Sequence, residues 1–552
     1  MAIREIYPDP ETIRRHVQSG AWPNTTLDDY LKQHARQRGD KVALVDRRWR
    51  LTFAELNRLA HRLACGLLYL GIKSGDVISM QTPNWAEWLL LHCAATKIGA
   101  VTNSIGAVYR QKEVGYILEY AETALMLIPD TFRAFSYTAM LAELWPRLPS
   151  LKHVLVVGED APEGMRSFQD FLDTPWEAQY PEDHLTSLRP APNHVTTLMF
   201  TSGTEANPKG AMHTHNTSIS GAEMLWNMYE LSRDDVVFMA SPIGHTTALL
   251  VGARLPVMYG LTAVWQEHWN AEEAVDLIAR EGCTFTLSAT PFLHGLVHAP
   301  NANRDTLQRF RLFSCGGAPI PRELIKRAEE QHGFLVSALY GSSEALINSA
   351  ITADDPIEQR HGSDGKIAPG VEARLVDPDT GEVVSPGAAG ELQVSTVALF
   401  VGYYKDPERT REVCSVDGWY STGDLCTLDE ENYLSVVGRK KDMIIRGGAN
   451  ISAREIEELL FAYPKVADVA CIAMPDPVLV ERVCVYVICT PGETLTFDEM
   501  IAFLKDKRMA VWKLPERLEI RDAFPMTPSG KVQKYVLRAE IAALLGQQAL
   551  IR

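Results

Sequence analysis

Residues 201–211 combine three hydroxyl side chains, two glycines and a lysine, directly after a strand-like run at 195–200. Backbone N–H, hydroxyl and ammonium donors at this spacing can surround phosphate oxygens. A cluster of Gly, Ser, Thr and Pro also forms plain solvated loops, so the segment alone leaves both interpretations open. It is not a Walker A loop, because Lys209 precedes the second glycine, Gly210.

Four further segments combine glycine with hydroxyl residues, and three of them also contain a charged residue. They are Ser-Cys-Gly-Gly-Ala-Pro at 314–319, Tyr-Gly-Ser-Ser-Glu-Ala at 340–345, Tyr-Ser-Thr-Gly-Asp-Leu at 420–425 and Pro-Met-Thr-Pro-Ser-Gly-Lys at 525–531. A carboxylate beside phosphates can hold a hard cation that bridges their oxygens. Taken alone, residues 314–319 are more often a plain turn, and Glu344 and Lys531 are more often solvent-facing charges. Asp424 in a Thr-Gly-Asp turn leaves a structural and a functional interpretation open.

In this order, from residue 201 to residue 531, the motifs resemble those of the adenylate-forming (AMP-binding) superfamily. This superfamily includes acyl-CoA synthetases, firefly luciferase and the adenylation domains of peptide synthetases. Its signature loop looks like T-S-G-T-T-G-x-P-K-G, and here Glu205 and Ala206 replace the usual Thr-Gly. The resemblance covers essentially the whole chain. It implies an acyl-CoA synthetase similar to the medium-chain and cyclohexanecarboxylate-type ligases, which uses ATP, Mg²⁺ and coenzyme A.

The resemblance also implies which residues bind the nucleotide and the other co-substrate. Those residues are Thr201, Ser202, Gly203, Thr204 and Lys209, then Gly316, Gly317 and Ala318, then Tyr340, Gly341, Ser342 and Ser343, then Asp424, Arg439 and Lys441, and finally Gly447 and Gly448. Asp424 is expected to accept hydrogen bonds from both ribose hydroxyls, because a carboxylate has two acceptor oxygens.

Three residues are expected to act in catalysis. Lys531 matches the family's C-terminal lysine, and a cation beside the carboxylate and the α-phosphate offsets the repulsion between two anions. Glu344, together with Thr204, is expected to hold Mg²⁺. His245 lies where the family carries an aromatic residue or a histidine beside the acyl pocket, although a lone histidine is more often structural.

The class of acid that this protein would activate is predicted from the absence of a carboxylate in one segment. Residues 241–250 contain no Asp or Glu, whereas amino-acid adenylation domains commonly have an aspartate there for the substrate amine. A buried ammonium without a partner is costly. The apolar residues 248–250 and 224–226 favour a medium-chain, alicyclic or aromatic acid, although Glu223 stands beside the second group.

Several departures from the family pattern leave the acyl acceptor less certain than adenylation. The common Tyr-Pro is missing from residues 447–453, and Val480 stands where a glycine is usual. Rival interpretations are a ligase that loads a carrier-protein thiol, a luciferase-like oxygenase and a non-enzymatic nucleotide-binding protein.

Bulk composition fits a globular protein of more than one domain. The chain has 552 residues, 46% of them hydrophobic, and a net charge of −16, which argues against a nucleic-acid partner. Nine scattered cysteines without a C-x-x-C pair suit a reducing compartment. The N-terminus has no signal-like apolar region, and Arg254 and Pro256 interrupt the most apolar stretch. A cytoplasmic protein without a membrane span is expected, and the sequence leaves open whether it forms a homodimer.

Alternating helix and strand patterns predict an α/β fold. A capping box at Thr52 and Glu55 and a leucine stripe predict a helix over residues 52–70. A second capping box at Ser452 and Glu455 opens a compact new pattern, with strands expected at 466–473 and 483–489. We therefore expect two domains, residues 1–438 and 439–552. The resemblance implies that the first contains two α/β subdomains and a small β-barrel, and that the second is mobile about a hinge at Lys441.

Overall fold

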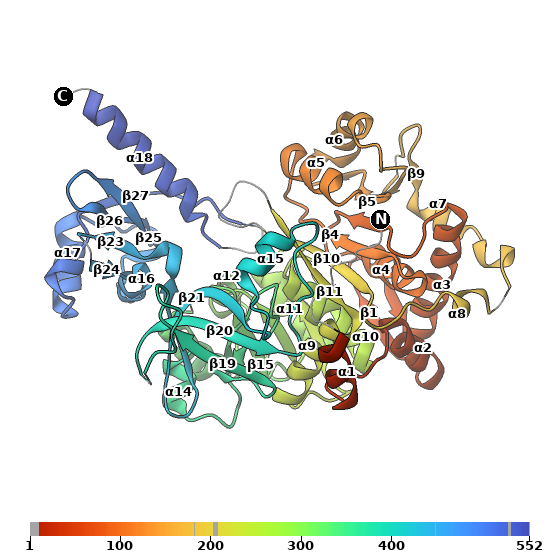
Figure 1. Cartoon of the computed structure of the whole chain (residues 1–552), viewed down its shortest axis with the longest axis horizontal. Coiled ribbons are helices and arrows are strands. Elements are labelled where there is room, and N and C mark those ends of the chain that lie inside the picture. The colour runs from red at the N-terminus through yellow and green to blue at the C-terminus, as the bar shows by residue number, and fades with distance from the viewer. Residues whose placement is uncertain are drawn as a thin grey trace.

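The computed structural model describes residues 10–550, apart from 160, 182, 202–207, 319, 386, 448 and 528–530, with side chains as far as residue 546. A large N-terminal domain is followed by a smaller C-terminal domain at one end of the molecule (Figure 1). The mixed α/β fold predicted from the sequence is confirmed.

The first subdomain is built on a seven-stranded sheet. Its strands, in spatial order, are β11 (Lys209–Thr214), β10 (Val195–Thr201), β4 (Val101–Ser104), β3 (Val77–Met80), β5 (Leu125–Pro129), β8 (His153–Val157) and β9 (Arg166–Ser167). All neighbours pair in parallel except β10 and β11. The helices α3 (Phe53–Tyr69), α4 (Ala86–Ile98), α5 (Gln111–Tyr120), α6 (Tyr137–Leu144) and α7 (Phe168–Asp173) belong to this part of the chain.

The helix predicted at residues 52–70 is confirmed as α3. Thr52 caps it, and the reciprocal bond from the Thr52 backbone N–H to Glu55 is present. Leu56, Leu59 and Leu63 are buried, as their spacing along one helix face requires.

The second subdomain is built on a nine-stranded sheet. Its order is β18 (Lys366–Ile367), β17 (Ser349–Ala350), β16 (Leu335–Tyr340), β15 (Leu312–Gly316), β14 (Phe285–Ser288), β12 (Val236–Met239), β13 (Thr262–Trp265), β1 (Val42–Val45) and β2 (Arg50–Thr52). The helices of these segments are α2 (Leu27–Gln37), α9 (His215–Met228), α10 (Leu255–Tyr259), α11 (Ala271–Glu281), α12 (Thr290–His298), α13 (Arg322–Arg327) and α14 (Ile357–Gly362). A π-helix, η3 (Ala248–Arg254), precedes α10.

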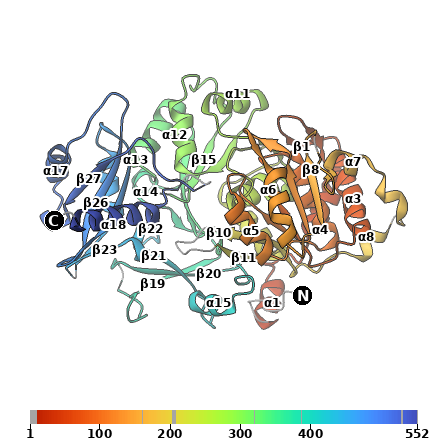
Figure 2. The same ribbon diagram turned by 90° about the horizontal axis from the view of Figure 1, so that it is seen from above.

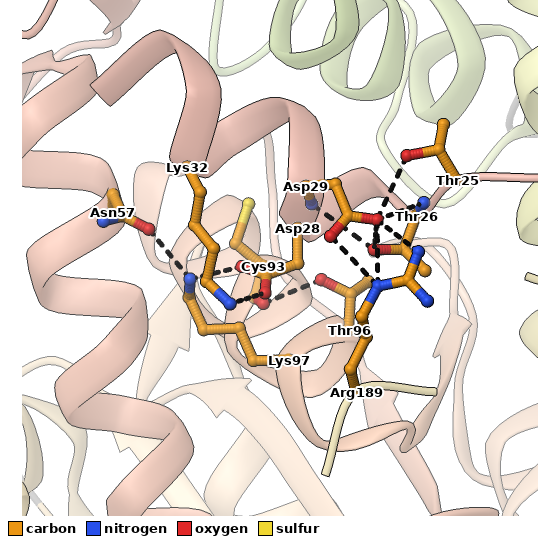
Figure 3. Close-up of polar contacts among 10 residues, drawn as sticks. All are labelled: Thr25, Thr26, Asp28, Asp29, Lys32, Asn57, Cys93, Thr96, Lys97 and Arg189. Carbon is orange, nitrogen blue, oxygen red and sulfur yellow. Dashed lines mark hydrogen bonds and ion pairs between the residues drawn. The ribbon is translucent and has the colours of Figure 1, made fainter. Parts of the chain in front are cut away.

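A buried charge cluster ties α2 to α3 and α4 (Figure 3). Lys97 is 1% exposed and donates to Asp28, and at 2.8 Å to Asn57. Asp29, in the first turn of α2, completes a capping box with Thr26 and pairs with Arg189 at 2.7 Å. A buried ammonium is tolerated only when it is paired in this way, so the cluster fixes the packing of these helices.

The expected small β-barrel is an open sheet in the part of the chain that the structure describes. The strands β19 (Val371–Val376), β20 (Gly390–Thr396), β21 (Tyr420–Leu428) and β22 (Leu434–Arg439) form an antiparallel meander, and no pairing joins β19 to β22. The helix α15 (Pro407–Val413) precedes β21. The prediction of closure is therefore wrong for the described residues, because only consecutive strands pair.

The C-terminal domain has its own sheet and core. The strands β24 (Ala449–Ile451), β23 (Ile444–Arg446), β26 (Val480–Cys489) and β25 (Val466–Asp476) follow in order, and β27 (Arg517–Ile520) pairs with β26. The helices α16 (Ala453–Phe461) and α17 (Phe497–Asp506) pack on it, and α18 (Lys534–Leu550) crosses the strands (Figure 2). Ser452 caps α16, but Glu455 pairs with Lys513 rather than completing the predicted capping box.

The chain passes from one domain to the other through the short helix η5 (Lys440–Asp442), between β22 and β23. This path is consistent with our boundary after residue 438, which stays a prediction. Within the described residues, no helix is both long and apolar enough to cross a bilayer.

Candidate active site

A cavity of about 1570 Å³ lies where loops from the carboxyl ends of β10, β15 and β16 face the C-terminal domain. Ligands of open α/β sheets characteristically bind outside the carboxyl ends of strands. Of the predicted site residues, the cavity is lined by Thr201, Lys209, His245, Gly317, Ala318, Tyr340, Gly341, Ser342, Ser343, Glu344, Asp424, Arg439, Lys441 and Lys531. Segments that are far apart in the sequence are thus brought to one place.

The remaining predicted residues are not brought to the cavity or cannot be placed. Ser202, Gly203, Thr204 and Gly448 lie outside the described residues. Gly316 ends β15, and a side chain there would come within 2.5 Å of the Leu339 carbonyl oxygen, so its role in the structure is close strand pairing. Gly447 is exposed in the turn between β23 and β24, away from the lining.

Glu344 lies in a buried network with Lys209 and Tyr403. The Glu344 carboxylate is 2.9 Å from Lys209 Nζ, and its Oε1 accepts a 2.8 Å bond from the Tyr403 hydroxyl. Burial alone raises the pKa of Glu344, but the Lys209 charge and these bonds outweigh it and hold the pKa below its ordinary value. The carboxylate is therefore ionised at neutral pH, close to an ammonium.

Tyr403 is a site residue that sequence reasoning missed. It follows Gly402, and its segment pairs with β11, where Tyr404 N–H donates to the Gly210 carbonyl at 2.8 Å. Its separation from Lys209 in the sequence leaves no local pattern that could signal the contact. Burial and the adjacent Glu344 raise the pKa of Tyr403, so the hydroxyl keeps its proton and donates it.

Asp424 is held between Tyr340 and Arg439. The Tyr340 hydroxyl donates to Asp424 Oδ2 at 2.7 Å, and Arg439 Nε lies 3.2 Å from Oδ1. Asp424 and Arg439 are cross-strand partners in β21 and β22, so strand register creates this pair. Asp424 lines the cavity, and each of its carboxylate oxygens can accept a further hydrogen bond, as a ribose ligand requires.

Lys531 reaches into the same cavity from the C-terminal domain. Its side chain passes over Gly317, since a Cβ at that glycine would lie 3.3 Å from Lys531 Cε and 3.7 Å from Nζ. Gly317 has φ +83°, a conformation that favours glycine and keeps this space open. The Lys531 main chain is held by a 3.0 Å bond from its N–H to Thr527 Oγ1.

Surrounding protein changes the titration of Lys531 and His245. Burial and the neighbouring Arg439 charge lower the pKa of Lys531 to about 8, against the opposing effects of Asp424 and Glu344. The Lys531 side chain is only half-buried, because it borders the cavity. Protein atoms nevertheless surround it at longer range. Burial, followed by the Lys531 charge, lowers the pKa of His245 to about 4, so its imidazole is neutral at pH 7.

The His245 segment is joined directly to the Tyr340 loop. The hydroxyls of Thr246 and Ser343 are 2.7 Å apart, and His213 on β11 contacts the Ser343 carbonyl at 2.7 Å. His245 Nδ1 lies 3.1 Å from the Thr247 hydroxyl and 3.4 Å from the Thr247 backbone N–H, which donates to it. His245 therefore presents a neutral imidazole, held through Nδ1, at the cavity wall.

Part of the cavity wall consists of glycines and apolar side chains. Gly106, Met199, Phe200, Pro242 and Gly244 line it. A side chain on Gly244 would come within 2.7 Å of the Gly106 backbone, so these two glycines allow the loops to touch. The residues expected here, 248–250, are buried in the core instead and do not line the cavity.

Glu344 is the carboxylate that could take part in holding a metal ion. The described residues contain no group of three or more His, Cys, Asp or Glu arranged for a metal. Proteins commonly hold Mg²⁺ through one or two carboxylates plus substrate phosphates, so Glu344 could hold it together with the phosphates of a bound nucleotide. Thr201 Oγ1 is buried without a hydrogen-bond partner among the described residues, at the start of the predicted phosphate loop.

Two protein-family models match the sequence of this chain. A model described as AMP-binding enzyme matches residues 31–404, and one described as AMP-binding enzyme C-terminal domain matches residues 455–531. The chain belongs to the AMP-binding enzyme family. The first match includes Lys209, Tyr340 and Glu344 of the cavity, and the second ends at Lys531.

Similar proteins match this AMP-binding enzyme over nearly its whole length. A medium-chain fatty-acid–CoA ligase of Escherichia coli is 34% identical and covers 96% of this chain and 93% of its own. A 2,3-dihydroxybenzoate-AMP ligase of Bacillus subtilis is 32% identical and covers 98% of each. The ATP-bound crystal structure of MatB from Rhodopseudomonas palustris superposes with a TM-score of 0.83 at 28% identity, over 94% of this chain and 100% of its own.

One departure from the family pattern has a conformational consequence. Val480, where the motif usually has glycine, adopts φ +70°, which is rare for a β-branched residue. The neighbouring Leu479 carbonyl accepts a 2.8 Å bond from Gly447 N–H, which ties the turn to the hairpin of β23 and β24. The left-handed turn that the motif requires is thus kept in this AMP-binding enzyme without its glycine.

Proposed function

We propose that this AMP-binding enzyme is an AMP-forming acyl-CoA synthetase, which converts a carboxylic acid, ATP and coenzyme A to acyl-CoA, AMP and pyrophosphate. The observation that carries the proposal is the position of Lys531, which extends from the C-terminal domain over Gly317 into the cavity that also contains Glu344 and Asp424. A cation that the C-terminal domain brings into this cavity suits a reaction between two anions.

In the first half-reaction a substrate carboxylate oxygen attacks the α-phosphorus of ATP, the bond to the β-phosphate oxygen breaks, and pyrophosphate leaves. Lys531 would neutralise the charge that gathers between the carboxylate and the α-phosphate. Asp424 would accept from the ribose, while Tyr340 and Arg439 hold it in place. Mg²⁺, held by Glu344 and the phosphates, would offset charge on the leaving pyrophosphate.

In the second half-reaction the sulfur of coenzyme A attacks the acyl carbonyl carbon, loses its proton, and AMP leaves with the former carboxylate oxygen. No protein nucleophile is required, because the adenylate is already activated. We propose that the C-terminal domain rotates about Lys441, so that Lys531 withdraws and Gly447 and Gly448 approach. The exposed position of Gly447 in the present arrangement supports this order.

For the acid, we propose a medium-chain, alicyclic or aromatic carboxylate. The apolar wall formed by Met199, Phe200 and Pro242 supports an uncharged acyl group. Burying a free ammonium against this wall would be costly. The medium-chain ligase among the relatives also supports this choice.

A second candidate is a ligase that passes the acyl group to a carrier-protein thiol. The relative named as a 2,3-dihydroxybenzoate-AMP ligase favours keeping it. Both candidates share the first half-reaction and differ only in the acceptor.

The test is pyrophosphate release from ATP across a panel of carboxylic acids, with and without coenzyme A. We expect release with octanoate, cyclohexanecarboxylate or benzoate, and a thioester only when coenzyme A is present. Adenylate that accumulates and never reacts with coenzyme A would favour the carrier-protein candidate. The absence of pyrophosphate with every acid would reject both.

A further inference from the structure

A buried ion pair joins the two domains near the hinge. Arg454, in the first turn of α16, donates to Asp364 at 3.0 Å, and the two side chains are only 10% and 12% exposed. Asp364 precedes β18 in the N-terminal domain, whereas α16 packs on the C-terminal sheet. The pair therefore depends on how the domains are arranged.

Each partner is also held within its own domain. Asp364 accepts a 2.8 Å bond from Val436 N–H and lies 3.5 Å from Arg322, both N-terminal. Arg454 Nε donates to Glu458, one turn along α16, at 2.8 Å. Because each charge retains a partner when the domains separate, opening the pair leaves neither charge unpaired. Such a contact can be broken and remade, whereas breaking an isolated buried pair leaves an unpaired buried charge.

The position of Arg454 in its helix also points to a role between the domains. A cation in the first turn is disfavoured by the helix dipole, whereas a carboxylate is favoured there. Asp364 places a carboxylate from the other domain beside this cation, next to the 2.6 Å bond from Ser452 Oγ to the Val437 carbonyl. Ser452 caps α16 within its own domain, and the present arrangement of the domains adds these two contacts at the start of the helix.

We propose that Arg454 and Asp364 are a positioning pair, which holds the C-terminal domain where Lys531 lies in the cavity and opens for the second half-reaction. The inference rests on the proposed function and deepens it. Both residues line the same cavity as Lys531, and we assign them an effect through the position of Lys531 rather than a contact with the reacting atoms. The pair stabilises this arrangement of the domains and so increases the time that Lys531 spends in the cavity. Adenylation is therefore favoured over thioester formation.

The test uses Arg454→Gln and Asp364→Asn in the full chain, with the half-reactions measured by single turnover. Adenylate formation should fall about tenfold in each, within the range of coupling between two-state elements. Thioester formation from preformed adenylate should keep its wild-type rate. The double variant should be no worse than either single variant, because both remove the same contact.

A second measurement needs no substrate. The rate at which trinitrobenzenesulfonate labels Lys531, followed by mass spectrometry across pH, reports the pKa of its amine. Wild type should show a pKa of about 8, and Arg454→Gln should move it toward the ordinary lysine value of roughly 10.4. Arg454→Lys should restore much of the wild-type behaviour.

Glu458→Gln is the matched control, since it removes a carboxylate from Arg454 without touching the contact between the domains. Equal loss of both half-reactions in Arg454→Gln, with unchanged labelling of Lys531, would overturn the positioning role. If the wild-type chain forms no adenylate from any acid, the proposed function fails. The labelling profiles would still decide whether the pair holds Lys531 in place.

Discussion

Replacing Lys531 by arginine should abolish an alkaline decline in the rate of adenylate formation that we expect of the wild-type chain. Adenylation requires the protonated amine, and Lys531 has a pKa of about 8 in the free protein. The protonated fraction then falls from roughly nine-tenths at pH 7 to one-tenth at pH 9. The kcat/KM for ATP, which reports the free enzyme, should therefore fall about tenfold over this interval.

Bound ATP should move this alkaline decline to higher pH. The phosphates place negative charge beside Lys531 and raise the pKa of its amine again, so kcat should stay level to a higher pH than kcat/KM. Lys531→Arg should give a flat profile at reduced rate, because a guanidinium stays charged throughout. Lys531→Ala should lose roughly 10²- to 10⁴-fold in adenylation and should show no alkaline limb.

The assay is single-turnover formation of acyl-adenylate from pH 6 to pH 10, in buffers of constant ionic strength. The thioester step, started from preformed adenylate, is the internal control and should be nearly unaffected by either substitution. An alkaline limb that survives in Lys531→Ala would assign the titration to another group. Equal losses in both half-reactions would contradict the role given to Lys531.

Four further predictions address the rest of the site. Asp424→Asn should weaken ATP binding by about tenfold, as loss of a charge-assisted bond implies, and because it also removes the ion pair with Arg439 the folded state should be checked by its melting temperature; normal binding in calorimetry would show that Asp424 has only a structural role. Glu344→Gln should raise the Mg²⁺ concentration needed for half-maximal adenylation, and an unchanged requirement would remove it from the metal site. Lys441→Pro, which fixes φ near −65°, should spare adenylation and suppress thioester formation; wild-type rates of both would show that the hinge lies elsewhere. In pyrophosphate-exchange assays hydrophobic acids should be turned over and free amino acids hardly at all, and efficient exchange with an α-amino acid would overturn the pocket assignment.

The parts of the site that the sequence predicts are those with local signals. The glycines and hydroxyls of residues 340–345 lie together because a turn needs them together: a side chain on Gly341 would come within 1.9 Å of the Leu346 carbonyl oxygen. Lys531 is predictable only from resemblance, since its contact with Gly317 depends on how two domains meet.

The parts that escape prediction arise from contacts between distant segments. Tyr403 reaches Glu344 because an extended segment joins the edge of β11, and Arg454 reaches Asp364 across the domain boundary. Neither pairing has a spacing that a sequence pattern could reveal. The apolar character of residues 248–250 favours an acyl pocket in the sequence, yet burial in the core explains it equally well.

The central claim is that the substrate carboxylate attacks the α-phosphorus of ATP, and the fate of one carboxylate oxygen tests it most directly. Octanoate labelled with ¹⁸O in its carboxylate would be incubated with ATP, Mg²⁺, coenzyme A and the protein, and the products would be analysed by mass spectrometry. Attack on the α-phosphorus predicts one ¹⁸O in AMP and none in pyrophosphate. Release of ADP with the label in inorganic phosphate would show attack at the γ-phosphorus and would contradict an acyl-adenylate mechanism.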